Sequence, residues 1–288
     1  MTLASCQKNI QIAVPDGPQE IVLAVGGDDI EMGVDTKATA LTALPSPLYW
    51  EGTSGTWKSE TAKWSSESKS VTTSGDSKVI NTGKYQTATP TAYNYYLSNK
   101  AITFASGGST IVPTNDTDVI AGCTQAATNS TAPSVTMDHV FARTGTLTAK
   151  PESGYTLSSV SCKIASKSGG TGGTAGTYNI ATKTWSSITA LSSTTLGSFS
   201  GSSTSQLTSS SDMYLTPGVY TITVTYTLSI GDDKEWTKTF TKSGDVTLVA
   251  GKVNSITWTC PSDGTATKIT ISVSLNSWGT QALTLTLS

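Results

Sequence analysis

Few residues of this sequence have side chains that commonly carry out chemistry, and the first of them is its single histidine, His139. A Ser-His-Asp or Cys-His arrangement would need this residue as its base. His139 lies in a segment from Met137 to Arg143 that reads as a β-strand. Alternation places it on the same side as Met137 and Phe141. We therefore interpret His139 as a packed strand residue and not as a catalytic base.

The four cysteines, Cys6, Cys123, Cys162 and Cys260, are far apart in the sequence. None of them forms a CxxC pair, and with one histidine this excludes a zinc site of the usual ligand spacing. If Cys6 is acylated, at most one disulfide can form among the other three. Buried single thiols are an equally good interpretation.

A glycine-rich segment, GTGGTA at residues 170–175, superficially fits a dinucleotide-binding fingerprint. It lacks the following helix and the βαβ unit that this chemistry requires, so we interpret it as a flexible loop. Asp232, Asp233 and Glu235 lie at a predicted hairpin turn, where solvation explains their charge. No P-loop and no HExxH motif occurs. The sequence therefore predicts a non-enzymatic protein with no cofactor and no metal.

The composition excludes further classes. Only 13% of the 288 residues are charged, against about a quarter in an average soluble protein. No stretch of about 18 apolar residues is present, as a transmembrane helix would require. The net charge is −2, and Arg143 is the only arginine among the 18 basic residues. Because clustered cations are absent, we expect no nucleic-acid partner.

Period-two alternation, which is typical of β-strands, recurs along the chain and indicates an all-β fold. Ser and Thr fill the polar positions and suit the solvent face of a sheet. The clearest strand runs from Tyr220 to Ile230. Two more alternate at 10–14 and 21–25 around a Pro-Asp-Gly-Pro turn. Further strands are predicted at 48–50, 93–97, 102–105, 119–121, 135–149, 155–164, 178–185, 188–199, 236–240, 246–250, 256–260 and 269–275.

Two features of the chain indicate how it is organised. Residues 124–133 (TQAATNSTAP) are rich in Ala, Ser, Thr and Asn, which favours an interdomain linker. We therefore predict domains at 1–130 and 131–288, each a β-sandwich. The chain ends with Leu283, Leu285 and Leu287 separated by threonines, which predicts a last amphipathic strand at 282–288.

The N-terminus carries the segment Leu3-Ala4-Ser5-Cys6, which resembles the end of a bacterial lipoprotein signal. In such signals a small residue precedes the cysteine that becomes lipidated. The charged start and apolar core of a signal peptide are missing, so we expect that the sequence begins late. Acyl chains on Cys6 would hold the protein on a membrane.

Several segments, taken in order, resemble the fimbrillin family, the Mfa-like or FimA-like subunits of Bacteroidales type V pili. They are LASC at 3–6, TKATALTAL at 36–44, DHVFART at 138–144, GTYNIATKTW at 176–185 and ITISVSLNSW at 269–278. The resemblance covers nearly the whole chain, and it rests on the order of the motifs.

This resemblance implies two tandem β-sandwich domains of transthyretin-like or Ig-like Greek-key type, with little helix. It also implies export as a lipoprotein to the outer membrane and a place on the cell surface in a fimbrium. A protease would remove an N-terminal strand, at about residues 8–36. The exposed groove would then take a strand from another pilus subunit. The family's best-known members are cut after Arg, but no Arg precedes Arg143 here, so we expect cutting between Lys37 and Ala38.

The residues give this mechanism a physical basis. An unpaired sheet edge is a template for another strand, and alternate side chains of that strand fill pockets. Leu283, Leu285 and Leu287 would form the donor strand. Their burial contributes roughly 5–8 kcal/mol at about 1.5–3 kcal/mol each. The alternative, that this strand completes its own sheet, has equal weight at this point, and the subunit's place as stalk, tip or anchor stays open.

Three other functions compete with a pilus subunit. A surface glycan-binding lipoprotein could stack sugars on aromatic residues such as Trp50, Trp57 and Trp64, although packing is favoured for them. A Gram-positive pilin would carry a sorting signal with an apolar tail after the last strand. A hydrolase built on a β-sandwich is the least favoured.

Overall fold

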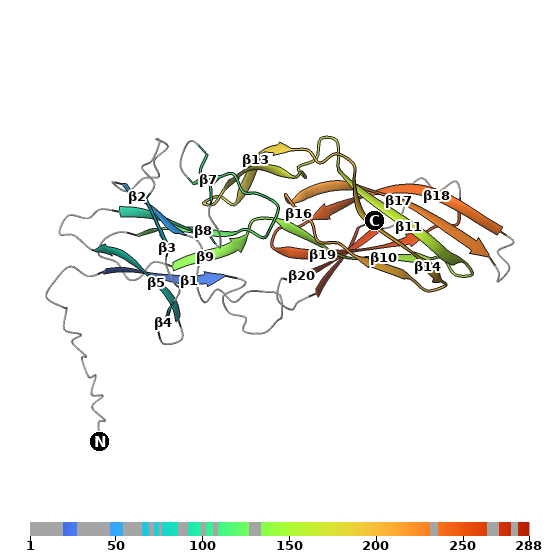
Figure 1. Cartoon of the computed structure of the whole chain (residues 1–288), viewed down its shortest axis with the longest axis horizontal. Helices are drawn as coiled ribbons and strands as arrows, with labels where there is room; N and C mark the ends of the chain where they lie inside the picture. Colours follow the sequence, from blue (N-terminus) through green and yellow to red (C-terminus); the bar gives the residue numbers. More distant parts are fainter. Residues whose placement is uncertain are drawn as a thin grey trace, which may run out of the picture.

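The computed structural model describes an elongated protein built of strands (Figure 1). No helix occurs in the part of the chain that it describes, and so no described helix could cross a membrane. The described residues are 20–27, 47–53, 65–68, 72–74, 77–85, 92–98, 102–105, 109–126, 134–230, 236–263, 271–277 and 282–287. The all-β prediction is confirmed.

An eight-stranded sheet forms the end of the molecule that contains the early strands (Figure 1). Its order is β3 (Ser65–Ser68), β2 (Pro47–Thr53), β6 (Ala92–Ser98), β8 (Ile120–Ala126), β9 (Ser134–His139), β1 (Glu20–Gly27), β5 (Ser77–Tyr85) and β4 (Thr72–Ser74). β1 lies between two neighbours: it runs parallel to β9 and antiparallel to β5. The predicted strand at 21–25 is thus confirmed, whereas the one at 10–14 lies outside the described residues.

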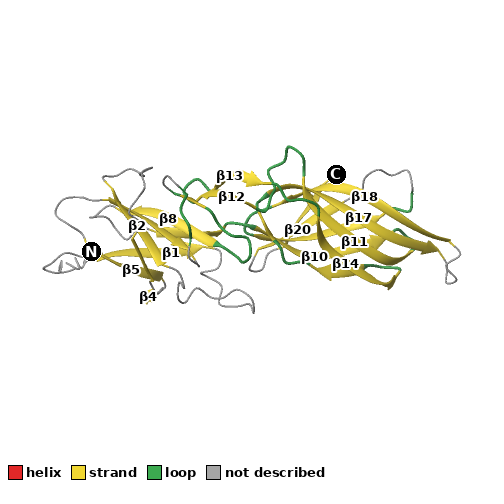
Figure 2. Ribbon diagram, turned by 45° about the horizontal axis from the view of Figure 1, so that its top comes forward, coloured by secondary structure: helices red, strands yellow, loops and turns green. Residues whose placement is uncertain are grey.

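Two further sheets pack face to face at the other end (Figure 2). One has the order β15 (Leu207–Ser210), β10 (Ala142–Pro151), β19 (Lys252–Cys260), β20 (Ile271–Ser277) and β21 (Ala282–Leu287), with β16 (Tyr214–Leu215) also on β10. The other has the order β14 (Thr194–Ser203), β11 (Thr156–Ser166), β17 (Gly218–Ile230) and β18 (Trp236–Leu248). One apolar core lies between them, and it draws residues from both sheets.

The alternation of β17 shows how composition produces this sandwich. Tyr220, Ile222, Val224, Tyr226 and Leu228 are fully buried, and the threonines between them lie on the opposite face. These threonines pair with hydroxyls of β18 in a row: Thr223 with Ser243, Thr225 with Thr241 and Thr227 with Thr239, at 2.9–3.0 Å. The expected Ser/Thr solvent face is confirmed. Paired hydroxyls supply the polar surface there that charged side chains supply in most proteins.

A small third unit joins the two ends. β12 (Ala175–Asn179) and β13 (Thr184–Thr189) form a hairpin, and β12 pairs with β7 (Thr110–Ile111). A second apolar cluster surrounds this sheet and includes Tyr96, Ile111, Phe141 and Tyr178. Strands that are far apart in the sequence therefore hold the eight-stranded sheet against the sandwich.

The structure corrects several predicted strands. The single strand at 135–149 is two strands, β9 and β10, in different sheets. Val140 still donates its N–H to the Val119 carbonyl beside β8 at 2.8 Å, and β10 begins two residues later, at Ala142. The strands at 236–240 and 246–250 are one strand, β18, whose polar middle pairs with β17. Residues 102–105 make only an isolated bridge, at Phe104.

The proposed division at 130/131 remains a prediction. Within the predicted linker, residues 124–126 form the end of β8. β9 follows the linker but pairs with β8 and β1, so residues 134–139 belong to the eight-stranded sheet. The chain passes to the sandwich between His139 and Ala142, where β9 ends and β10 begins.

Candidate functional site

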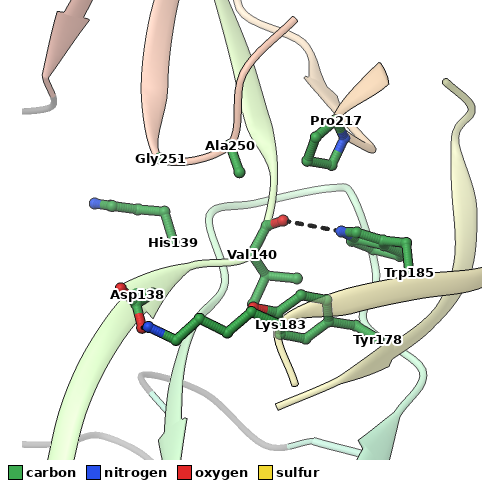
Figure 3. A pocket seen from close by; sticks show the side chains of 9 residues that line it. All are labelled: Asp138, His139, Val140, Tyr178, Lys183, Trp185, Pro217, Ala250 and Gly251. Atoms are coloured by element: carbon green, nitrogen blue, oxygen red, sulfur yellow. Dashed lines mark hydrogen bonds and ion pairs between the residues drawn. The ribbon is translucent and has the colours of Figure 1, made fainter. Parts of the chain in front are cut away.

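The junction between the eight-stranded sheet and the sandwich contains a small cavity of about 160 Å³ (Figure 3). Lys183 Nζ lies 2.8 Å from Asp138 Oδ2 at its rim. Trp185 donates its indole N–H to the Val140 carbonyl at 3.3 Å, and its ring packs at 5.2 Å from that of Phe141. These contacts hold the β12–β13 hairpin against residues 138–141, at the end of β9 and just after it.

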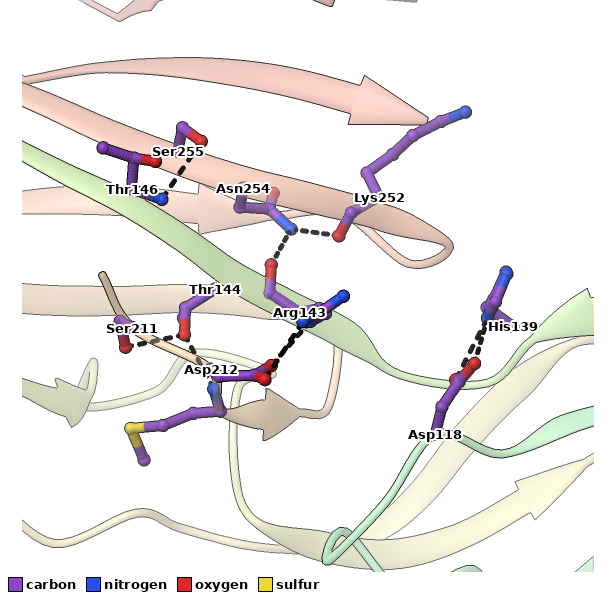
Figure 4. Close-up of polar contacts among 11 residues, drawn as sticks. Asp118, His139, Arg143, Thr144, Thr146, Ser211, Asp212, Lys252, Asn254 and Ser255 are labelled. Atoms are coloured by element: carbon purple, nitrogen blue, oxygen red, sulfur yellow. Dashed lines mark hydrogen bonds and ion pairs between the residues drawn. The ribbon is translucent and has the colours of Figure 1, made fainter. Parts of the chain in front are cut away.

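His139 lies at this junction, and its ring points away from Trp185 (Figure 3). The residue is buried, and Nδ1 is 2.8 Å from Asp118 Oδ2 and 3.0 Å from Oδ1. Figure 4 shows that pair apart from the other polar contacts drawn. Packing of His139 in the interior is confirmed. The cavity lining contains no serine or cysteine that His139 could activate, and the described residues contain no cluster of metal-ligating side chains.

The only arginine of the chain has a structural role (Figure 4). Arg143 binds Asp212 through Nε and Nη2 at 2.6 and 3.0 Å. Its carbonyl accepts a hydrogen bond from Asn254 Nδ2 at 3.1 Å, and Asn254 also bonds the turn before β19 through Val249. Asn254 is fully buried. Sequence reasoning missed it, although its alternation with Ile256 and Trp258 is a signal for an inward polar residue.

The glycine-rich segment packs closely against the sandwich, in contrast to the flexible loop that the sequence indicates. Gly173 donates its N–H to Tyr220 Oη at 2.7 Å, and the Tyr220 hydroxyl reaches the Thr216 carbonyl at 2.6 Å. A Cβ on Gly172 would lie 2.5 Å from the Tyr220 ring. The glycines therefore allow close approach to a buried tyrosine, and no helix follows them to bind a phosphate.

Cys123, Cys162 and Cys260 are free thiols, which decides between the two interpretations left open by the sequence; Cys6 lies outside the described residues. Burial raises the pKa of Cys162 and of Cys260 to about 12. Burial also raises the pKa of the half-buried Cys123 to about 11, against the opposing effect of Lys183. The thiols are therefore protonated at neutral pH and poorly nucleophilic.

Alkylation of these thiols by iodoacetamide at pH 8 should be at least about a hundredfold slower in the native protein than in urea, because the thiolate is the nucleophile.

The same pKa shifts should lower the free energy of unfolding at alkaline pH. Above about pH 8.5 the unfolded thiols ionise while the folded ones stay protonated, so unfolding releases protons and its free energy falls as pH rises. Equal alkylation rates in the native and unfolded protein would contradict this account.

Of the residues predicted to take part in assembly, the three leucines of the last strand lie in the described part of the chain. β21, which contains Leu283, Leu285 and Leu287, ends its sheet and pairs with β20 of its own molecule. Its register sets Leu285 opposite Val273 and Leu287 opposite Ile271, and both of these partners are buried. Cys6, Lys37 and Ala38 lie outside the described residues, as do Trp57 and Trp64, whereas Trp50 lies in β2.

The fold has counterparts among solved structures. A fimbrial protein of Bacteroides vulgatus is 14% identical, with a TM-score of 0.53 over 90% of this chain and 99% of that one. The chain shares the fold of this fimbrial protein. Proposed cell adhesion proteins of Bacteroides uniformis and Parabacteroides distasonis are 14% and 9% identical, each with a TM-score of 0.49 over 90% of this chain and 99% and 97% of theirs.

The sequence resemblance to the Bacteroidales fimbrillins is thereby confirmed at the level of the fold. No family model matches the sequence, and no curated protein matches it.

Proposed function

We propose that this chain is a structural, non-catalytic subunit of a surface pilus that serves adhesion, and that its copies join by exchange of strands. The shared fold with a fimbrial protein supports the pilus role. The observation that carries the assembly mechanism is the position of two strands. β1 is near the N-terminus yet lies inside a sheet, and β21 is an apolar-alternating strand at the outer edge of another sheet.

The place of β1 explains why its removal would open the molecule. β1 makes backbone pairs with β9 on one side and β5 on the other, for example Val25 with Val135 and with Lys78. If a protease cuts between Lys37 and Ala38 and the fragment leaves, both neighbours lose their partner at once. One incoming strand could then pair on two sides, which doubles the backbone hydrogen bonds that it gains.

β21 has the properties of a donor. Among the described strands it pairs only with β20, so its release breaks one set of backbone bonds, whereas its insertion in place of β1 would form two. Before processing, lipid on Cys6 would hold the subunit at the outer membrane.

Glycan binding receives no specific support from the described aromatic residues. Trp258 is buried in the sandwich core. The Trp236 ring packs against Tyr155 at 5.6 Å, and Lys238 Nζ lies 5.2 Å from its centroid. A sugar could stack there only by displacing one of these neighbours.

Limited digestion of the full chain with a Lys-specific protease should release the N-terminal fragment and produce ladders or fibres visible by electron microscopy. The variant K37A should remain intact at this site and unassembled, while the matched variant K8A should assemble like the wild type. Assembly of K37A would refute processing at Lys37. If the trimmed wild type stays monomeric at every concentration, the strand-exchange proposal fails.

A further inference from the structure

The strand β9 has few partners within its sheet. Its described backbone pairs are with β1 along residues 134–137 and with β8 at residues 138 and 139. If β1 leaves, the first of these two sets of pairs is lost. The side chains of Val135 and Met137 are buried, but a strand can receive a new partner only while its backbone stays extended and in place. The end of β9 therefore decides whether the seam keeps its shape.

The β12–β13 hairpin, residues 175–189, starts from a fixed point on the sandwich. It is inserted between β11 and β14, and below it the Ser166 N–H donates to the Leu191 carbonyl at 3.0 Å. Gly173, just before β12, accepts the Thr216 N–H at 2.9 Å and donates its own N–H to Tyr220 Oη at 2.7 Å. Because Tyr220 lies in the core, the base of the hairpin cannot shift independently of the sandwich.

The other end of the hairpin is fixed outside the sandwich. β12 pairs there with β7, which lies between β6 and β8 in the chain. The Ile180 N–H donates to the Ser109 carbonyl at 2.9 Å, and Ser109 Oγ donates to Asn179 Oδ1 at 2.9 Å. With both ends held, the hairpin is a brace between the two parts of the molecule, and we use that name for residues 175–189.

Two side chains of the brace reach the end of β9 (Figure 3). The Val140 carbonyl accepts the indole N–H of Trp185 at 3.3 Å, and the Val140 N–H donates to the Val119 carbonyl at 2.8 Å. Val140 is thus held through both of its backbone groups. Lys183 Nζ lies 2.8 Å from Asp138 Oδ2, two residues earlier.

The two contacts differ in strength. The side chains of Lys183 and Asp138 are 57% and 31% exposed, so water screens their attraction and the ion pair contributes little. Trp185 is half-buried, and its ring lies 5.2 Å from that of Phe141 and 5.4 Å from that of Tyr178. Aromatic packing and the indole hydrogen bond act together there. Trp185 therefore contributes most of the hold on β9.

We propose that Trp185, assisted by Lys183, is a positioning residue that keeps β9 in place when β1 leaves, so that the seam is already shaped for an incoming strand. The hold on β9 in the uncleaved chain does not depend on the pilus role. Its consequence for assembly rests on the proposed exchange of strands.

The test is hydrogen exchange at the Val140 amide in the full chain carrying W185A, before and after digestion with the Lys-specific protease. Before digestion this amide should exchange at least about threefold faster than in the wild type, because one hydrogen bond and the ring packing are lost. After digestion the ratio should reach about tenfold or more, since β1 no longer holds β9. The trimmed variant should also assemble about tenfold more slowly than the trimmed wild type, because fewer molecules present a formed seam.

Two variants separate the brace from general damage to the fold. W185F keeps a ring against Phe141 and loses only the indole N–H, so its exchange rate should lie between those of W185A and the wild type. T184A is the matched control, because Thr184 is the exposed neighbour on β13 and its hydroxyl pairs with that of Thr182 at 2.7 Å. Its Val140 amide should exchange within about twofold of the wild type. If W185A does not fold, W185F carries the same test.

The proposal is overturned if Val140 exchanges at the wild-type rate in the uncleaved W185A chain. It is also overturned if trimmed W185A assembles as fast as the trimmed wild type. If the trimmed wild type itself does not assemble, the exchange of strands fails as a mechanism, and the Val140 amide of the uncleaved chain still decides whether Trp185 holds β9.

Discussion

Replacing Leu283, Leu285 and Leu287 together by threonine should abolish the joining of trimmed copies. Each leucine contributes about 1.5–3 kcal/mol when buried, so junction affinity should fall by a factor of more than about 10³. Threonine retains β propensity, which leaves the backbone pairing of the strand available. The measurement is the fraction of protein that sediments as fibres after digestion at Lys37.

The matched control changes the other face of the same strand. Thr284 and Thr286 alternate with the leucines, so T284A/T286A should assemble within a few-fold of the wild type. Urea unfolding of the uncleaved variants is needed as well, because β21 also pairs with β20 in its own molecule. Wild-type assembly by the triple-threonine variant would show that β21 is not the donor, while a pilus role through another strand would survive.

The sequence located strands best where apolar residues alternate strictly with threonine. β17 and β21 carry strict alternation of apolar residues with threonine, and both were located within two residues of their observed ends. Local pattern suffices there because one face must be buried and a shift by one residue would expose it. The same reasoning placed Ser and Thr on the solvent face of the sandwich, but it did not predict that their hydroxyls pair in a row.

The junction could not be predicted, because its contacts are not local. β7 has two residues, Thr110 and Ile111, and it pairs with β12 more than sixty residues later. No alternation is visible in so short a strand. The change of sheet at Val140 was also missed, since Val140 and Phe141 are both buried and read as a continuation of the strand.

At the candidate site, too, local patterns could be predicted and contacts between distant residues could not. Interior packing of His139 followed from alternation, whereas its partner Asp118 is 21 residues away and lies before β8. The close packing of the glycine-rich segment on Tyr220 is equally invisible in sequence, because a glycine needed for close approach looks like a glycine in a loop. The roles of Cys6 and Lys37 stay predictions, from the signal-like segment that contains Cys6 and from the family resemblance.

A second large effect is expected in the sandwich core, at Trp258. This side chain is 1% exposed and lies on β19, the central strand of its sheet. Its ring centroid is 6.2 Å from that of Phe199 on the facing sheet, so it connects both layers. Trp258→Ala should lower the free energy of unfolding by about 3–5 kcal/mol, because it removes a large buried surface and leaves a cavity.

Urea unfolding followed by circular dichroism measures this change, with the m-value as a check on two-state behaviour. Thr259→Ala is the matched control, since this neighbour on the same strand is exposed and should change stability by less than about 0.5 kcal/mol. Trp258→Phe keeps an aromatic ring and should fall between the two. A loss below about 1 kcal/mol for Trp258→Ala would mean that the two sheets do not depend on this contact. The other apolar residues between the two sheets would then be sufficient to hold the sandwich together.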